Sequence, residues 1–228
     1  MGYRVRRATN LGQRWHLFAG DDQARVAAFH ELVAAPEVRA VLFARGGHGC
    51  LRALPRIDWE LIASQPKAYL GYSDLTPLLL QIVQRVGLVA FHGPMVATDL
   101  ARGLSDEEET SFRQALVGHP IDLPCTPLPD AQDVEGVLLG GCLSLLAATL
   151  GSSFEADLSD ALLFLEDVNE PLYRVDRMLT QLELSGSLKN VKAMILGHLE
   201  LTDPNLSEAL PDLLKETAWG AATLAATG

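Results

Sequence analysis

The stretch Gly71-Tyr72-Ser73-Asp74 decides how this chain is interpreted. It follows a short apolar run, Ala68-Tyr69-Leu70, and precedes a helical pattern over residues 75–86. A serine in a turn between a strand and a helix presents its hydroxyl above the sheet edge, and the next backbone N–H points to the same place. Position 75 is Leu, not the glycine of the usual G-x-S-x-G pattern. Neighbouring segments therefore decide whether Ser73 is a nucleophile or a helix cap.

Strand and helix patterns alternate through the first half of the chain. Strands are expected at residues 38–44, 67–72 and 88–91, and helices after Asp21-Asp22 and at 57–63 and 75–86. This alternation implies parallel strands with helical crossovers, and ligands of such sheets bind at the carboxyl ends of strands. Gly46-Gly47 and Ser73 lie at those ends. We predict an α/β fold with a flavodoxin-like parallel sheet in the N-terminal domain.

A cluster of prolines divides the chain. Pro120, Pro124, Pro127 and Pro129 crowd one short stretch. Proline at this density is incompatible with a helix or a central strand, so we interpret residues 119–133 as a linker. The predicted domains are residues 1–118, which carry Ser73, and a smaller α/β domain at residues 134–228.

The second domain has its own strand and helix signals. We expect a strand at 161–165 that ends in Glu166-Asp167, and another at 191–196. Pro171 suits the first turn of a helix that runs to Ser185 and stops at Gly186. The uncharged run 137–150 is too short to span a bilayer, so we predict a buried segment.

Composition excludes several classes of partner. Lys and Arg number 18 and Asp and Glu 29, which gives a net charge of −11. Such a surface repels nucleic acid and anionic membranes. The three cysteines form no CxxC pair, which argues against a zinc ribbon and fits a reducing cytosol. No HExxH and no phosphate loop is present, so no metal or cofactor is expected.

Five motifs in order carry a resemblance to a known family. They are Arg45-Gly46-Gly47-His48-Gly49, Gly71-Tyr72-Ser73-Asp74, Phe91-His92-Gly93-Pro94-Met95, residues 163–170 and residues 173–179. Together they resemble the LD-carboxypeptidase family, serine peptidases that trim murein tetrapeptides. Microcin-immunity peptidases are relatives of that family.

The resemblance assigns roles to six residues. It implies Ser73 as nucleophile, Glu166 as the acid that orients the base, Gly47 and Asp74 as oxyanion donors, and Arg45 and Gly46 in substrate binding. The chemistry agrees, because a serine hydroxyl needs an adjacent base and the tetrahedral intermediate needs N–H donors. Glu166 is expected to face Ser73.

Alternatives stay open at two of these positions. Glu170 and, more weakly, Asp167 are rival acids, and Glu166 at a strand end also fits a solvated carboxylate or an ion pair. Arg45 either binds the terminal carboxylate of a substrate or forms a structural ion pair.

The chain departs from the family pattern in three places. The resemblance places the base in a later Gly-His turn, but only His198, in Gly197-His198-Leu199, follows Glu166 among six histidines. A strand, a loop and a helix expected before Gly2-Tyr3-Arg4-Val5 are missing. Cys142 stands where the family usually has asparagine. We therefore expect a chain that is short at both ends, with a missing first strand and an incomplete C-terminal domain.

The function implied by the resemblance is that of a cytoplasmic serine carboxypeptidase. It would hydrolyse the L–D amide bond to the terminal D-alanine of murein tetrapeptides in cell-wall recycling, and it would form a homodimer. The alternatives are a truncated non-catalytic homologue and a peptidase of the microcin-immunity type. An α/β-hydrolase esterase fits worst because position 75 is not glycine.

Overall fold

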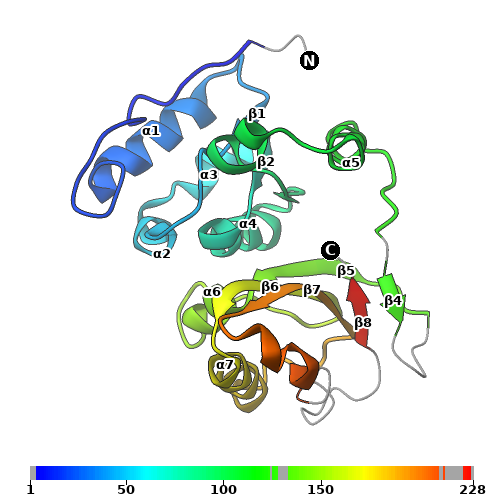
Figure 1. Ribbon diagram of the computed structural model, residues 1–228. Coiled ribbons are helices and arrows are strands. Elements are labelled where there is room, and N and C mark those ends of the chain that lie inside the picture. The colour runs from blue at the N-terminus through cyan, green and yellow to red at the C-terminus, as the bar shows by residue number, and fades with distance from the viewer. Residues whose placement is uncertain (1–3, 124, 128–132, 211–212, 214–222, 227–228) are drawn as a thin grey trace. The chain divides into compact units, whose positions relative to one another are not determined.

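The computed structural model describes residues 4–123, 125–127, 133–210, 213 and 223–226. The chain divides into two compact units, Met1–Pro120 and Ile121–Gly228 (Figure 1). Each unit has its own sheet.

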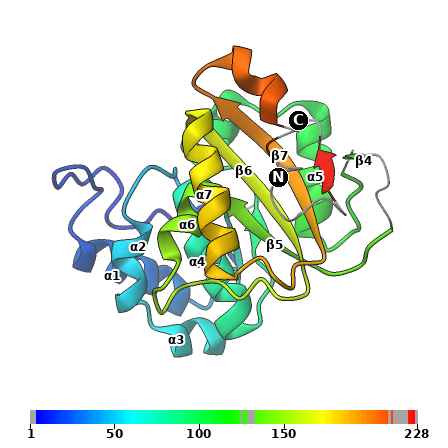
Figure 2. The same cartoon turned by 90° about the horizontal axis from the view of Figure 1, so that it is seen from below.

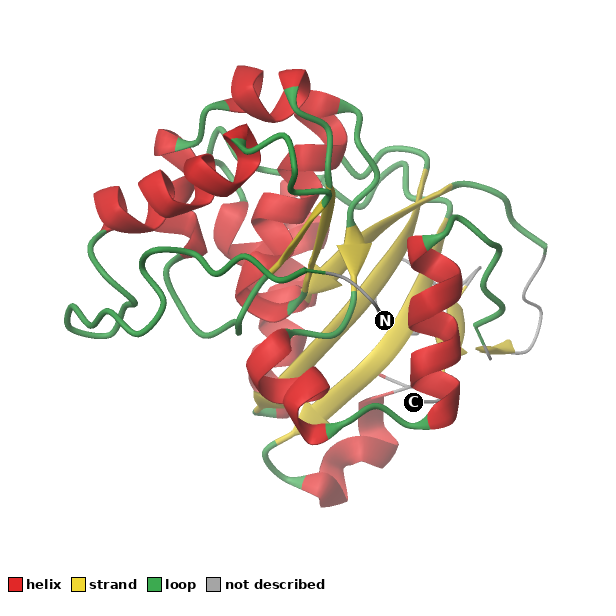
Figure 3. Ribbon diagram, turned by 90° about the horizontal axis from the view of Figure 1, so that it is seen from above, coloured by secondary structure: helices red, strands yellow, loops and turns green. Residues whose placement is uncertain are grey.

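The first unit is helix-rich, with short strands (Figure 3). Its elements are α1 (Asp22–Ala34), β1 (Ala40–Leu42), α2 (Cys50–Ala53), η1 (Leu54–Arg56), α3 (Trp59–Ser64), β2 (Ala68–Gly71), η2 (Ser73–Leu75), α4 (Thr76–Gln81), η3 (Ile82–Val86), β3 (Phe91–His92), η4 (Val96–Leu100) and α5 (Asp106–Leu116). The strands form one sheet in the order β1-β2-β3, and both pairs are parallel. The predicted parallel α/β arrangement is confirmed.

All three strands of this unit are shorter than predicted, β2 by one residue at each end. β1 covers only residues 40–42 of the predicted 38–44, because the N–H of Val38 donates instead to the carbonyl oxygen of Ala35. β3 begins at Phe91 and not at residue 88, and Val89 is 72% exposed. Apolar character alone does not fix the length of a strand, since ladder pairing also requires a neighbour.

The core of the first unit forms around β2 and the helices beside it. Its largest fully buried side chains are Val33, Leu54, Ile62, Tyr69, Leu70 and Ile82. Lys67, just before β2, is also buried. Its ammonium donates to the carbonyls of Ala35 and Val38 at 3.0 and 2.9 Å, and these bonds offset the cost of burying the charge.

The second unit is a five-stranded sheet with helices on one face. Its elements are β4 (Cys125–Pro127), β5 (Val137–Cys142), α6 (Leu143–Thr149), β6 (Ala161–Glu170), α7 (Leu172–Ser185), β7 (Ala193–Leu201), η5 (Pro204–Ala209) and β8 (Thr223–Ala226). The strand order is β4-β8-β7-β6-β5, with β4 antiparallel and the rest parallel. Figures 1 and 2 show α6 and α7 on the same face of this sheet, with α7 running alongside β6.

Turn chemistry in the second unit agrees with the sequence. Pro171 directly precedes α7, and Gly186 ends the helix in the left-handed conformation that glycine adopts freely.

The predicted linker at 119–133 contains β4, which lies at the edge of the sheet, where proline is tolerated. Residues 124 and 128–132 of that stretch lie outside the described residues.

Two predictions for the second unit are corrected. β6 does not end at Glu166-Asp167 but continues to Glu170 through shifts in its pairing with β7, where Asn169 adopts φ +59°. The run 137–150 is not buried throughout, because Val137 and Leu138 are 62% and 52% exposed on the edge strand β5. Its later part, including Leu143 and Leu146, is buried as predicted.

Gly140 lets β5 approach β6 closely. A Cβ placed on Gly140 would lie 1.9 Å from the carbonyl oxygen of Phe164, and the residue has φ +137°. A side chain at this position would push apart the two strands that carry Cys142 and Glu166.

Gly140→Ala should therefore lower the free energy of unfolding by at least about 3 kcal/mol, because backbone strain adds to overpacking. Gly151→Ala is the matched control: it also has positive φ, +73°, but nothing lies within 4 Å of its Cβ position. Its cost should be about 1 kcal/mol, the cost of a left-handed conformation alone. Urea unfolding of both variants measures the difference, and equal losses would contradict the close approach.

Candidate active site

Ser73 occupies a strained turn between β2 and α4. It is not glycine, yet it has φ +59°, in the sparsely populated left-handed region. Such strain at a strand-to-helix turn is the geometry that lifts a nucleophile clear of the sheet. The short helix η2 begins at Ser73, and its N-cap is Tyr72. Ser73 is thus not the cap of the helix, and that alternative interpretation is wrong.

Gly46 lies directly against Ser73. A Cβ on Gly46 would be 3.1 Å from both Cβ and Oγ of Ser73, and 3.5 Å from the backbone nitrogen of Asp74. A side chain here would crowd the hydroxyl, so this position requires glycine. Gly47 follows with φ +113°, and the Arg45 guanidinium lies 3.9 Å from its Cβ position. The structure therefore brings together the predicted residues of both turns in the first unit.

Asp74 links the two turns through its side chain. The side chain is buried, and its Oδ2 accepts a hydrogen bond from the Cys50 N–H at 2.9 Å. Cys50 directly follows the glycine-rich turn at 45–49. A buried carboxylate with a backbone donor is a strong hydrogen bond, so it fixes one end of that turn relative to Ser73.

The third motif of the first unit reaches the same sheet edge. The Gly93 N–H donates to the Gly71 carbonyl at 3.2 Å, and the ring of His92 lies 5.8 Å from that of Tyr72. The Tyr72 hydroxyl donates to Asp99 Oδ1 at 3.3 Å. Segments after all three strands thus meet around the turn that holds Ser73.

Glu166 lies on β6 in the second unit, in register with Cys142 on β5. Its Cβ is 3.4 Å from the position that a Cβ would take on Gly197 of β7. The side chain is half-buried. Burial, with a further contribution from the charge of Asp167, raises the pKa of Glu166 to about 7. A carboxyl with such a shifted pKa is a candidate for a functional group.

The two rival acids hold local structure. Asp167 is buried, and its carboxylate accepts from the N–H groups of Ser144 at 2.7 Å and Val168 at 2.9 Å. It thereby anchors the start of α6. Glu170 forms an ion pair with Arg174 at 3.1 Å. Successive strand residues point to opposite faces, so Glu166 points away from the face on which Asp167 meets α6.

His198 is exposed and lies within β7, which continues to Leu201. The strand predicted at residues 191–196 therefore begins later, at Ala193, and runs on through His198. The added ladder pairs of Leu199 and Leu201 with β6 explain the extension.

The described residues offer neither a metal site nor a membrane-spanning helix. Among them, no three His, Cys, Asp or Glu side chains are grouped so as to hold a metal ion. None of the helices within the same residues is both long and apolar enough to cross a bilayer.

Comparison with known proteins identifies the class. Residues 1–93 match the model of the LD-carboxypeptidase N-terminal domain, and residues 135–223 match that of the C-terminal domain. With the fold, these matches define an α/β peptidase class with two domains. The chain belongs to the LD-carboxypeptidase family.

Individual relatives agree with this assignment. The chain is 40% identical over 204 residues to a probable murein peptide carboxypeptidase of Bacillus subtilis, covering 86% of this chain and 63% of the relative. A crystal structure of muramoyltetrapeptide carboxypeptidase from Oxalobacter formigenes superposes with a TM-score of 0.82 at 32% identity, covering 98% of this chain and 79% of that one. The microcin C7 self-immunity protein of Escherichia coli is 28% identical over 217 residues, which cover 81% of this chain and 63% of that protein. The chain thus spans less than two thirds of the length of both curated relatives.

The raised pKa of Glu166 predicts a pH-dependent effect on stability. Its pKa is about 7 in the folded chain against an ordinary 4.5, so ionisation of Glu166 destabilises the folded state. The free energy of unfolding therefore falls as pH rises from about 4.5 to 7. Glu166→Gln removes that cost. The variant should be more stable than the unmodified chain at pH 8, by on the order of 2 kcal/mol, and equal to it near pH 4.

Thermal unfolding across this pH range measures the effect. Glu200→Gln, which changes an exposed carboxylate on β7, is the control and should follow the unmodified chain. Parallel curves for Glu166→Gln and the unmodified chain would show that Glu166 ionises normally.

Proposed function

We propose that this chain carries the nucleophile and the acid of a serine LD-carboxypeptidase. Its substrate would be a murein tetrapeptide, and the bond hydrolysed would be the L–D amide to the terminal D-alanine. The observation that carries the proposal is Ser73 at φ +59°, with Gly46 packed against both its hydroxyl and the backbone nitrogen of Asp74. The higher identity to the murein peptide relative supports the substrate class.

In the first half of the reaction, Ser73 Oγ attacks the carbonyl carbon of the scissile amide. The carbonyl oxygen becomes an oxyanion, which accepts hydrogen bonds from the N–H groups of Gly47 and Asp74. Collapse of the tetrahedral intermediate breaks the C–N bond, and the proton taken from the serine passes to the leaving amine of D-alanine. Water then attacks the acyl-serine ester and regenerates the hydroxyl.

The remaining residues supply charge and proton transfer in this proposal. A histidine takes the hydroxyl proton, and Glu166 orients the imidazole and stabilises its charged form. The ionised fraction of Glu166 rises steeply around pH 7, since its pKa is about 7. Arg45 is exposed and binds the carboxylate of the terminal D-alanine.

Further parts of the proposal rest on family membership. We infer a cytoplasmic homodimer that acts in peptidoglycan recycling. We further infer that residues 1–118 and 134–228 are the functional domains, with the acid on the second. Cleavage of a microcin-type antibiotic is the second candidate, which the more distant self-immunity relative favours less.

The test is release of D-alanine from a murein tetrapeptide. We compare the unmodified chain, its Ser73→Ala variant, and a version extended through the Gly-His turn expected from the resemblance. Ser73→Ala should abolish release from the active form, and the extended version should exceed the unmodified chain by on the order of 10³-fold if the turn supplies the base. Release that persists in Ser73→Ala would contradict the role of Ser73. An extended version that releases no D-alanine would favour the non-catalytic alternative.

A further inference from the structure

The turn at residues 45–49 has few means of fixing its own shape. Gly46, Gly47 and Gly49 make up most of it, and the last two adopt φ of +113° and +115°. Glycine gives the backbone more freedom than any other residue. Oxyanion donors act only when they are held in place before the reaction. Something outside the turn must therefore hold it.

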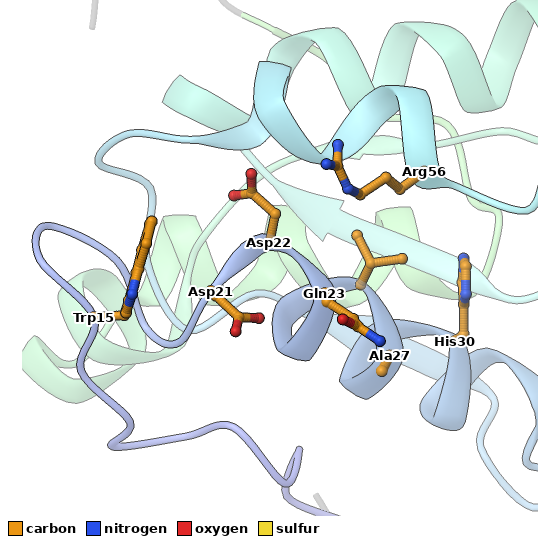
Figure 4. Close-up of a pocket in the computed structure, with 8 residues that line it drawn as sticks. Trp15, Asp21, Asp22, Gln23, Ala27, His30 and Arg56 are labelled. Carbon is orange, nitrogen blue, oxygen red and sulfur yellow. The ribbon is translucent and has the colours of Figure 1, made fainter.

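Phe18 packs against the turn from a neighbouring loop. Its ring atoms lie 2.7 and 2.8 Å from the Cβ position of Gly49, and its ring centroid is 5.6 Å from that of His48. Phe18 is itself fixed, because it exchanges two backbone hydrogen bonds with Trp15, at 2.8 and 2.9 Å, and stacks on the Trp15 ring. Figure 4 shows Trp15 on the loop that leads into α1.

Arg25 on α1 holds the same turn by hydrogen bonding. Its Nη2 donates to the carbonyl oxygen of Gly49 at 2.9 Å, and its guanidinium lies 5.3 Å from the centroid of the Phe18 ring. Asp22, at the start of α1 in Figure 4, pairs with Nη1 at 3.3 Å. The Arg25 side chain is only 18% exposed, so this geometry is sheltered from solvent.

Arg52 provides a natural comparison. Its guanidinium lies over the same ring at 5.2 Å, and it pairs with the same Asp22 at 2.8 Å. Its side chain is 48% exposed, and its bonds go to Asp22 and not to the carbonyl of Gly49. Both arginines are cationic, lie over the Phe18 ring and pair with Asp22. Arg25 differs from Arg52 in that it also donates to the carbonyl of Gly49.

We propose that Phe18 and Arg25 are positioning residues for the oxyanion donors. Arg25 bonds to Gly49 and the Phe18 ring packs against His48, while Asp74, beside Ser73, accepts from the N–H of Cys50. Gly46 is thereby kept against Ser73, with Gly47 next to it in the same turn. The inference rests on the proposed function and deepens it, because it names what gives a flexible turn a single conformation.

A boronic acid tests the donors without requiring a general base. The probe is the murein tripeptide in which B(OH)₂ replaces the scissile carbonyl group of the third residue. Ser73 Oγ forms a bond to boron, the hydroxyl proton goes to water, and boron becomes a tetrahedral anion whose oxygen takes the place of the oxyanion. The same tripeptide as a primary carboxamide forms no such bond and reports ground-state binding alone.

The experiment compares Arg25→Gln with Arg52→Gln in the full chain. Arg25→Gln should weaken boronate binding about tenfold or more, as part of the roughly 10²–10³-fold that loss of a whole donor costs, and should leave carboxamide binding unchanged. Arg52→Gln should alter neither by more than about twofold. Phe18→Leu should behave like Arg25→Gln, with Leu17→Ala, at an 84% exposed position, as its control.

Thermal unfolding identifies variants that fail to fold. If Arg25→Gln unfolds, Arg25→Lys replaces it, because an ammonium keeps the charge but lacks the planar fork whose two nitrogens contact Asp22 and the Gly49 carbonyl. Equal boronate affinity in the Arg25 and Arg52 variants, or parallel loss of both ligands in a folded variant, would overturn the positioning role. If the unmodified chain binds neither probe, or if Ser73→Ala binds the boronate as well as it does, the proposed function itself fails.

Discussion

The absence of a side chain at Gly46 is the constraint on which the candidate site depends. A single methyl group there would stand 3.1 Å from the Ser73 hydroxyl. Without one, two turns from different strands approach closely, so the Ser73 hydroxyl and the backbone nitrogen of Asp74 lie next to Gly46. The cost appears as left-handed φ at Ser73 and Gly47, about 1–3 kcal/mol for the serine. The buried bond from Cys50 to Asp74 helps to offset it.

In the second unit, two neighbouring carboxylates have opposite effects on stability. Glu166 and Asp167 are neighbours in sequence, yet strand alternation sends them to opposite faces of the sheet. Asp167 accepts hydrogen bonds from the backbone N–H groups of Ser144 in α6 and of Val168 in β6, and it stabilises the fold. Glu166 is half-buried with its pKa raised to about 7, which destabilises the ionised form. The pairing of β6 with β7 shifts between Leu165 and Asp167 and again between Asp167 and Glu170, and such irregularities are over-represented next to active sites.

Local signals in the sequence predicted much of this structure. Periodicity indicated parallel strands joined by helices, and turn residues located the start of α1 at Asp21-Asp22 and the glycine that ends α7. Pairing determines where strands end, so the extension of β6 through Asn169 was not predictable from hydrophobicity. The motifs placed Ser73, Gly46 and Asp74 together correctly, whereas the approach of Glu166 to Ser73 stays a prediction. Phe18 and Arg25 were missed, because a lone aromatic residue and a helical arginine carry no motif.

The rate at which a fluorophosphonate modifies Ser73, mapped by mass spectrometry of peptides, tests the central claim most directly. The phosphoryl oxygen needs the same donors as an oxyanion, and the reagent does not depend on the identity of the substrate. Gly46→Ala should slow modification by about tenfold or more. Gly93→Ala should leave it unchanged, because nothing lies within 4 Å of its Cβ position. Equal rates of modification of Ser73 in the Gly46→Ala and Gly93→Ala variants would contradict the account.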